Sequence, residues 1–321
     1  MSASRAPLLA LFAAALIAAG CAPTRTTLKY GANGEGELRV WPAQQTEEVA
    51  RYRYVGELTG EANLKPESGN GTTAAGVLRW LVGLDERKVD PVVLQRPQSG
   101  MVDERGRVLV TDVSRKSVFV FDEAGGTLEL WEEAAPNLRF ESPIGIAAGK
   151  GGEFLVTDAE LGRVFRLDGA GKPVGAFGEG VLRRPTGIVR DAARGLVYVA
   201  DTHAHDVKVF DDAGALVAAL GQRGDRLGEF NFPTHLAFSR GTLYVTDVLN
   251  SRVQGLAATG EARSRFGERG LYVGNLVRPK GVAADDEGNI YVVESLYDTL
   301  GVFDREGRLL LSIGGTGKDG G

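Results

Sequence analysis

A short apolar segment closed by an acidic residue recurs along most of this chain, and it constrains the fold more than any other feature. Its acids lie 46, 43, 46 and 47 residues apart, and an apolar residue follows each acid after nine positions. Periods of this length are typical of propellers and other repeat arrays. The five copies are Val108-Leu-Val-Thr-Asp112, Phe154-Leu-Val-Thr-Asp158, Val197-Tyr-Val-Ala-Asp201, Leu243-Tyr-Val-Thr-Asp247 and Ile290-Tyr-Val-Val-Glu294.

Each copy also carries the marks of three further strands. A proline precedes the acid by about fifteen residues and begins a first strand, as in Pro185-Thr-Gly-Ile-Val189. A glycine-containing turn such as Asp211-Asp-Ala-Gly214 follows the third strand, and the fourth strand usually closes on glycine, as at Gly221. Four short antiparallel strands form one propeller blade, which must stack on other blades to bury both of its faces. The chain's 45 glycines fit the many tight turns that this fold needs.

These repeats resemble the NHL repeat family. The copy from Pro185 to Asp211 is the most similar to the family pattern, and the next keeps Asp247, Asn250 and Arg252 at the matching places. The resemblance covers residues 94 to 314 and implies an all-β, six-bladed propeller. It implies little about activity, because one fold hosts many functions.

Five full repeats are present, so the sixth blade has to be accounted for. Residues 51–60 read like a lone fourth strand, which would join C-terminal strands in a shared blade. The final residues, 313–321, match the segment that leads from one blade to the next. We therefore expect a sequence that lacks about three strands of its last blade, since an open ring exposes strand edges. The alternative is that residues 37–60 supply the sixth blade alone.

The N-terminus predicts export and lipid attachment. Arg5 precedes an apolar run from Leu8 to Ala19, which is too short to span a bilayer and suits a signal peptide. The run leads to Cys21, the only cysteine, in a context that resembles the bacterial lipobox. We expect a lipoprotein signal peptide at 1–20, palmitate or another acyl chain on Cys21, and a tether at 21–36. By the same resemblance Ala22 favours the outer membrane over the inner, with the protein facing the periplasm or the surface. The alternative is an ordinary secretory signal followed by a chance cysteine.

Residues 37–93 form the next predicted unit, with the propeller at 94–321. Within it, Val77, Leu78, Trp80, Leu81 and Leu84 repeat at helical spacing over residues 73–88. An amphipathic helix there would pack against one end of the ring or dock on a partner or membrane.

Few residues are candidates for chemistry. The repeated acids are expected to accept N–H bonds from adjoining loops, with a ring of metal ligands as the alternative. His203 and His205 lie in a loop between second and third strands, which makes them solvated loop residues or a metal-binding pair. His235 stands where other copies carry Gly145, Gly187, Gly281 or Ser99, so it projects into the channel as a core residue, a lone ligand or a base.

The enzyme classes of this fold are not matched. The propeller lyase that completes peptide amidation places zinc-binding histidines directly after the strand prolines, where this chain has Gln98, Ile144, Thr186, Thr234 and Lys280. The calcium ligands of propeller lactonases cannot be assembled either, and no Gly-x-Ser-x-Gly, P-loop or His-Glu-x-x-His motif occurs. A net charge of −5 argues against nucleic acid as the partner.

The sequence therefore predicts a non-enzymatic scaffold, without cofactor or metal, that binds an envelope protein and is held at the membrane by lipid. The expected contact residues are Arg96, His203, His205, Lys280 and Tyr297, together with Trp80. The alternative is a metal-dependent lyase or lactonase centred on His235. A small ligand in the channel is also compatible with the sequence.

Overall fold

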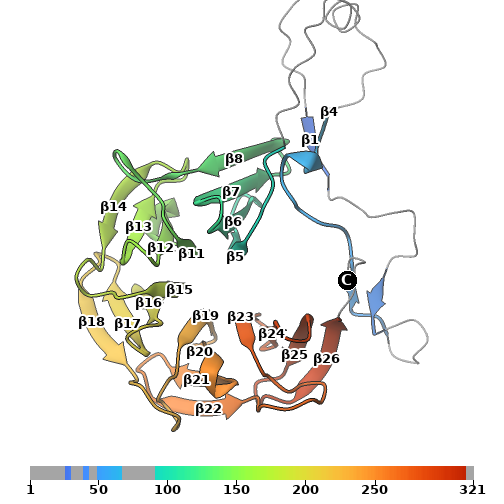
Figure 1. Cartoon of the computed structure of the whole chain (residues 1–321), viewed down its shortest axis with the longest axis vertical. Coiled ribbons are helices and arrows are strands. Elements are labelled where there is room, and N and C mark those ends of the chain that lie inside the picture. The colour runs from blue at the N-terminus through green and yellow to red at the C-terminus, as the bar shows by residue number, and fades with distance from the viewer. Residues whose placement is uncertain (1–25, 30–38, 43–48, 67–90, 316–321) are drawn as a thin grey trace, which may run out of the picture.

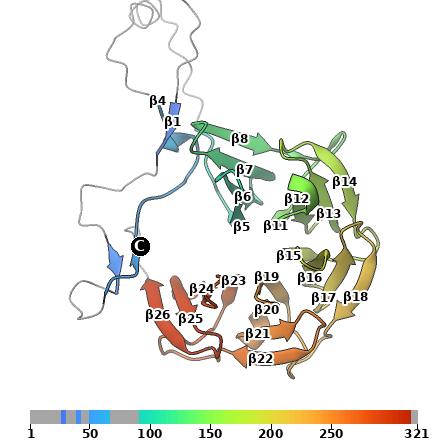
Figure 2. The same ribbon diagram turned by 180° about the vertical axis from the view of Figure 1, so that it is seen from behind.

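The computed structural model describes residues 26–29, 39–42, 49–66 and 91–315. Five four-stranded antiparallel sheets surround a common axis, each with its first strand innermost and its fourth outermost (Figure 1; Figure 2 from behind). The described part of the chain contains no α-helix. The predicted all-β propeller is confirmed. The blades are β5 (Pro97–Val102), β6 (Val108–Asp112), β7 (Ser117–Asp122), β8 (Thr127–Trp131); β11 (Pro143–Ala148), β12 (Phe154–Asp158), β13 (Arg163–Leu167), β14 (Pro173–Phe177); β15 (Pro185–Asp191), β16 (Leu196–Asp201), β17 (Asp206–Asp211), β18 (Leu216–Leu220); β19 (Pro233–Ser239), β20 (Thr242–Asp247), β21 (Arg252–Ala257), β22 (Ala262–Phe266); β23 (Pro279–Ala284), β24 (Ile290–Glu294), β25 (Thr299–Phe303) and β26 (Leu309–Gly314).

The repeated prolines and acids mark the strand ends. Each innermost strand begins on its proline, which needs no N–H for the ladder at that position. Each second strand ends on its acid, and the two residues pair in register, as Pro185 does with Asp201. Glycine allows the chain to turn tightly between strands. In the turn between β17 and β18, Gly214 has a φ of 90° and donates its N–H to the carbonyl of Asp211 at 2.9 Å.

The core lies between neighbouring blades. Alternate residues of a strand face opposite neighbours, so that Tyr198 of one blade packs with Leu236 and Leu243 of the next. The Tyr198 hydroxyl also donates to the carbonyl of Ala258 at 3.0 Å, across the same interface. Near the axis, a Cβ at Gly187 would come within 2.7 Å of the Cα of His235, so only glycine lets these inner strands approach so closely.

Short N-terminal elements lie beside the sector between the first and last blades (Figure 1). β1 pairs with β4, and Leu28 of β1 packs on Phe119 and Phe121 of the first blade. The short strands and 3-10 helices (η) outside the five blades are β1 (Thr26–Leu28), β2 (Val40–Trp41), β3 (Tyr52–Arg53), η1 (Glu61–Asn63), β4 (Leu64–Pro66), β9 (Glu133–Ala135), β10 (Leu138–Arg139), η2 (Lys150–Gly152) and η3 (Val248–Asn250).

Residues 51–60 differ from the expected lone fourth strand. Only Tyr52 and Arg53 are in strand conformation, and they pair with β2 in a two-stranded sheet. Gly56 and Gly60 have φ values of 140° and 146°, which interrupt an extended strand. The described residues hold five blades and no sixth four-stranded sheet.

Several expectations lie outside the described residues. They are the signal peptide and Cys21, most of the tether, the helix at 73–88 with Trp80, and the last six residues. In the part that is described, no helix is long and apolar enough to cross a membrane.

Candidate functional site

The acids at the ends of the second strands organise one end of the ring. Asp158 is fully buried, and its two carboxylate oxygens accept four backbone N–H bonds. Two come from Glu141 and Ser142, ahead of the blade's proline, at 2.7 and 3.0 Å. The other two come from Glu160 and Leu161, in the next loop, at 3.1 and 3.0 Å. The carboxylate thus fixes both segments, as the structural interpretation of these acids predicts.

The other blades use the same device. Asp112, Asp201, Asp247 and Glu294 each accept at least one N–H from the segment before their blade's proline. We call the resulting surface the loop face; it consists of residues 113–116, 159–162, 202–205, 248–251 and 295–298, with the segments that precede the five prolines. Because the acids are committed to N–H groups, the alternative of a metal-binding ring is not supported. In the described ranges, no group of three or more His, Cys, Asp or Glu side chains could hold a metal ion.

Arg96, Tyr297, His203 and His205, four of the predicted contact residues, lie on the loop face, and Lys280 borders it. The Arg96 carbonyl accepts the N–H of Val113 at 3.3 Å, and the residue is exposed. Lys280 is exposed on β23, directly after its proline. Tyr297 is half-buried, and its hydroxyl donates to the carbonyl of Gly270 at 2.9 Å, so that it braces a neighbouring loop.

His203 and His205 both pack around Phe232 of the next blade. The ring centroids lie 6.0 Å and 4.8 Å from that of Phe232, in edge-to-face arrangements. His205 has a left-handed φ of 59°, and its Nδ1 accepts the N–H of Phe232 at 3.3 Å. In the other four blades the residue directly before the proline donates its N–H to the strand-end acid, so this imidazole replaces the acid for one bond, while Asp247 accepts the N–H of Asn231. The pair is a blade-to-blade contact in this geometry, with His203 exposed to solvent.

His235 lines the central channel, as its position after Pro233 predicts. It borders a cavity of about 230 Å³ together with Gln98, Gly187 and Gly281 from three other blades. Its Nε2 lies 3.4 Å from the carbonyl of Gln98, and its Nδ1 lies 3.2 Å from the Thr234 hydroxyl. Burial and, to a smaller extent, the charge of Lys280 lower the pKa of His235 to about 4. A neutral imidazole therefore faces this cavity at neutral pH, and it can accept a proton or bind a ligand.

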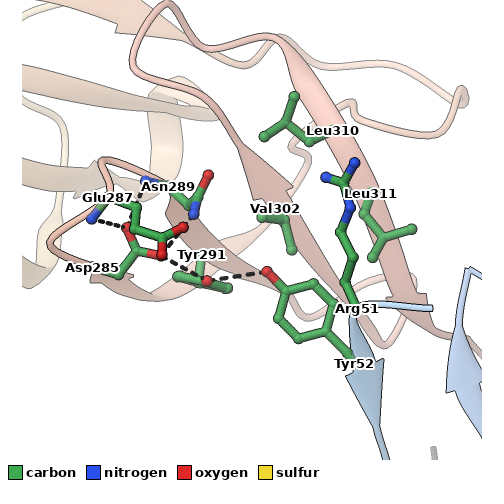
Figure 3. A pocket seen from close by; sticks show the side chains of 9 residues that line it. All are labelled: Arg51, Tyr52, Asp285, Glu287, Asn289, Tyr291, Val302, Leu310 and Leu311. Carbon is green, nitrogen blue, oxygen red and sulfur yellow. Dashed lines mark hydrogen bonds between the residues drawn. The ribbon is translucent and has the colours of Figure 1, made fainter. Parts of the chain in front are cut away.

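A larger cavity, of about 530 Å³, lies on the free side of the last blade, and sequence reasoning missed it (Figure 3). The Tyr52 hydroxyl lies 3.1 Å from that of Tyr291, which donates to Asp285 Oδ2 at 2.9 Å. Burial works to raise the pKa of Asp285, but hydrogen bonds from Asn289, Tyr291 and Gly288 outweigh it and lower that pKa to about 2. Burial and the two hydrogen bonds raise the pKa of Tyr291.

One signal of this cavity was present in the sequence. Tyr291 occupies the same strand position as Tyr198 and Tyr244, which are buried against the following blade. In the last blade, Tyr291 instead contacts Tyr52 of β3 and lines the cavity. The cavity lining, which includes the Arg51 and Glu287 side chains, suits a polar ligand.

Comparison with known proteins agrees with the propeller class that the blades define. The model of the NHL repeat matches residues 182–210. Protein brain tumor of Drosophila melanogaster is 30% identical over 145 residues, which cover 44% of this chain and 13% of that protein. Peptidylglycine alpha-amidating monooxygenase of Rattus norvegicus is 26% identical over 227 residues, covering 61% of this chain and 23% of that protein. The chain thus spans less than a quarter of either relative.

Solved structures share the fold at low identity. A chain of the nidogen–laminin complex has a TM-score of 0.56 at 21% identity, covering 70% of this chain and 84% of that one. A gluconolactonase from Xanthomonas campestris has a TM-score of 0.54 at 18% identity, with coverages of 73% and 82%. Virginiamycin B lyase from Staphylococcus aureus has a TM-score of 0.52 at 14% identity, with coverages of 67% and 69%. The fold is a β-propeller, and the chain contains a match to the NHL repeat at residues 182–210.

Proposed function

We propose that this protein is a non-enzymatic scaffold of the bacterial cell envelope, which is anchored by lipid on Cys21 and binds a protein partner through the loop face. The observation that carries the proposal is the bonding of the strand-end acids to the loops in all five blades. Loops that are already ordered lose little entropy on binding, which favours recognition by their side chains.

Arg96, His203 and Lys280 offer the side chains for such a contact. Arg96 and His203 lie on the loop face, Lys280 borders it directly after Pro279, and all three are exposed. Of these, arginine is enriched at protein interfaces. The nidogen–laminin complex provides an example of a related propeller fold in a protein–protein assembly.

The test is site-specific crosslinking in cells with the full-length chain. A photo-crosslinking residue at His203 or Lys280 should capture one recurrent envelope protein, identified by mass spectrometry. The matched control is the same residue at Lys172, an exposed turn position at the opposite end of its blade. Equal capture from both ends, or none from the loop face, would refute the proposal.

The anchor is tested separately. Replacement of Cys21 by Ala should release the protein from the membrane fraction, and radiolabelled palmitate should enter the unchanged chain only. If the Cys21→Ala chain remains in the membrane fraction, lipid on this residue is not what holds it there.

A metal-dependent lyase or lactonase is the second candidate, favoured by the neutral imidazole of His235 in the channel cavity. Metal analysis of the purified full chain distinguishes it from the scaffold. A stoichiometric metal that is lost in the His235→Ala variant would support the enzyme, and a stable metal-free chain would count against it.

A further inference from the structure

Three consecutive apolar side chains project from one loop of the ring. Leu271, Tyr272 and Val273 are 88%, 84% and 76% exposed in the segment that joins β22 to β23. Single exposed apolar residues are ordinary, but adjacent ones of this size mark a surface that contacts something apolar.

The loop that carries them is held firmly at its base. Asn275 clamps the tip, since its Oδ1 accepts the N–H of Tyr272 at 2.8 Å and its own N–H donates to the Tyr272 carbonyl at 3.0 Å. Leu276 is buried in the core and donates its N–H to Glu268. The bond from Tyr297 to Gly270 adds a further support. The three side chains are thus kept outside the core by a braced turn.

The preceding blade shows that the fold does not require an apolar tip. Its corresponding segment, residues 221–232, begins Gln222-Arg-Gly-Asp-Arg226 and contains one exposed aliphatic residue before the buried Phe230, Leu227 at 48%. Arg252 binds the carbonyls of Asp225, Arg226 and Glu229 and fixes that segment too. The apolar tip is therefore a property of one loop.

Basic side chains precede and follow this tip along the chain. Arg265, Arg269, Arg278 and Lys280 are all exposed, and none of the four forms a salt bridge with any described residue. Glu268 is the single carboxylate within residues 267–278. Residues 267–278 thus hold two arginines, Arg269 and Arg278, against one carboxylate, in a chain whose net charge is −5.

Size and charge together favour a bilayer over a protein as the occupant. Three side chains bury a few hundred Å² at most, well below the roughly 800 Å² per partner of a stable protein interface. An exposed apolar tip with an aromatic residue, and with arginines in the same loop, shares the chemistry of segments that enter the lipid headgroup region, where apolar and aromatic side chains combine with Lys and Arg. We propose that residues 270–274 insert into the interface of a membrane with anionic headgroups.

This inference goes beyond the proposed function and does not depend on lipid at Cys21. Insertion of residues 270–274 would place part of the loop face against the bilayer. A protein partner of the loop face would then also lie at the membrane surface. The cations add electrostatic attraction, which salt weakens, while the apolar contact persists.

The first test places a polarity-sensitive fluorophore on a cysteine in the full chain carrying Cys21→Ser. With vesicles of phosphatidylcholine and phosphatidylglycerol, a label at Tyr272→Cys should shift to the blue and be quenched by nitroxide-labelled lipids. A label at Leu227→Cys, on the matching loop of the preceding blade, should do neither. Equal behaviour of the two labels would overturn the proposal, as would a shift at 272 that requires an added protein.

The second test measures partition onto the same vesicles by sedimentation. The triple variant Leu271→Ser, Tyr272→Ser, Val273→Ser should bind at least about tenfold more weakly, given the apolar area removed. The control Leu227→Ser should bind like the unchanged chain. Arg269→Glu with Arg278→Glu should weaken binding to anionic vesicles and leave binding to phosphatidylcholine alone unchanged. Since all these positions are exposed, the melting temperature should not change, and unchanged partition of the triple variant would refute the insertion.

Discussion

The hydroxyl of Tyr52 meets the hydroxyl of Tyr291 at 3.1 Å, with the two rings edge to face at 6.3 Å between centroids. Tyr52 belongs to the small N-terminal hairpin of β2 and β3, whereas Tyr291 belongs to the last blade. In the third blade, Tyr198 at the equivalent position donates to the backbone of the following blade. The N-terminal hairpin therefore takes part of the place that a following blade has elsewhere in the ring.

Loss of the Tyr52 hydroxyl should loosen this hairpin. The Tyr52→Phe variant keeps the ring contact but removes the hydrogen bond, at a cost of about 1 kcal/mol. Hydrogen exchange of residues 49–53 should accelerate while exchange in the blades stays unchanged. The exposed Tyr272→Phe serves as control and should have no effect. Unchanged exchange in the Tyr52→Phe variant would show that the hydroxyl pair does not hold the hairpin.

Asp158 should be among the most sensitive residues for stability. In Asp158→Asn, an NH₂ group replaces one of the two oxygens that accept backbone N–H groups. The backbone N–H groups that faced this oxygen are then buried without an acceptor, which costs about 1–3 kcal/mol each. Urea unfolding should therefore show a loss of about 3 kcal/mol. Glu160→Gln, two residues away and paired with Arg184 on the surface, should change stability by less than about 0.5 kcal/mol. Similar losses for both variants would contradict the proposed role of the acid.

Arg252 joins a buried ion pair to the loop before the fourth blade. Its Nε lies 2.9 Å from Asp247 Oδ2, and both side chains are at least 94% buried. Arg252→Leu should lower the free energy of unfolding by about 3–5 kcal/mol, because it leaves an unpaired buried carboxylate. Arg263→Leu removes an exposed pair with Glu261 in the same blade and should cost less than about 1 kcal/mol. A mild effect of Arg252→Leu would show that Asp247 finds another partner or becomes protonated.

His235 should make the protein less stable in acid. Its pKa falls from 6.5 to about 4 on folding, so the unfolded chain binds more protons between these values and stability decreases as pH falls through that window. By linkage, the loss between pH 7 and pH 5 is about 2 kcal/mol.

The His235→Gln variant should lose that part of the pH dependence, measured by urea unfolding at the two pH values. His203→Gln is the matched control, since His203 is exposed on the loop face, and it should keep the dependence of the unchanged chain. An identical pH profile for His235→Gln and the unchanged chain would show that the imidazole is not held neutral in the channel.

Much of the fold and part of the site could be predicted from local patterns. Pro185 and Asp201 delimit their strands as expected, because strand ends and turns are encoded by residues close in sequence. The channel position of His235 followed from its place after Pro233 in the repeat. The His203 and His205 contact with Phe232 could not be found in this way, because it depends on a left-handed backbone and on the neighbouring blade.

The sequence by itself determined the period, the four strands of each blade, the structural use of the acids and hence the propeller class. These features follow from alternation and spacing within about fifty residues, which recur in every copy. Only the tertiary structure decided that Tyr52 meets Tyr291, 239 positions away, and that the apolar residues 271–273 face outward while Leu276 turns inward. Such outcomes depend on how distant segments pack, since an apolar side chain is buried only where another part of the chain arrives to cover it.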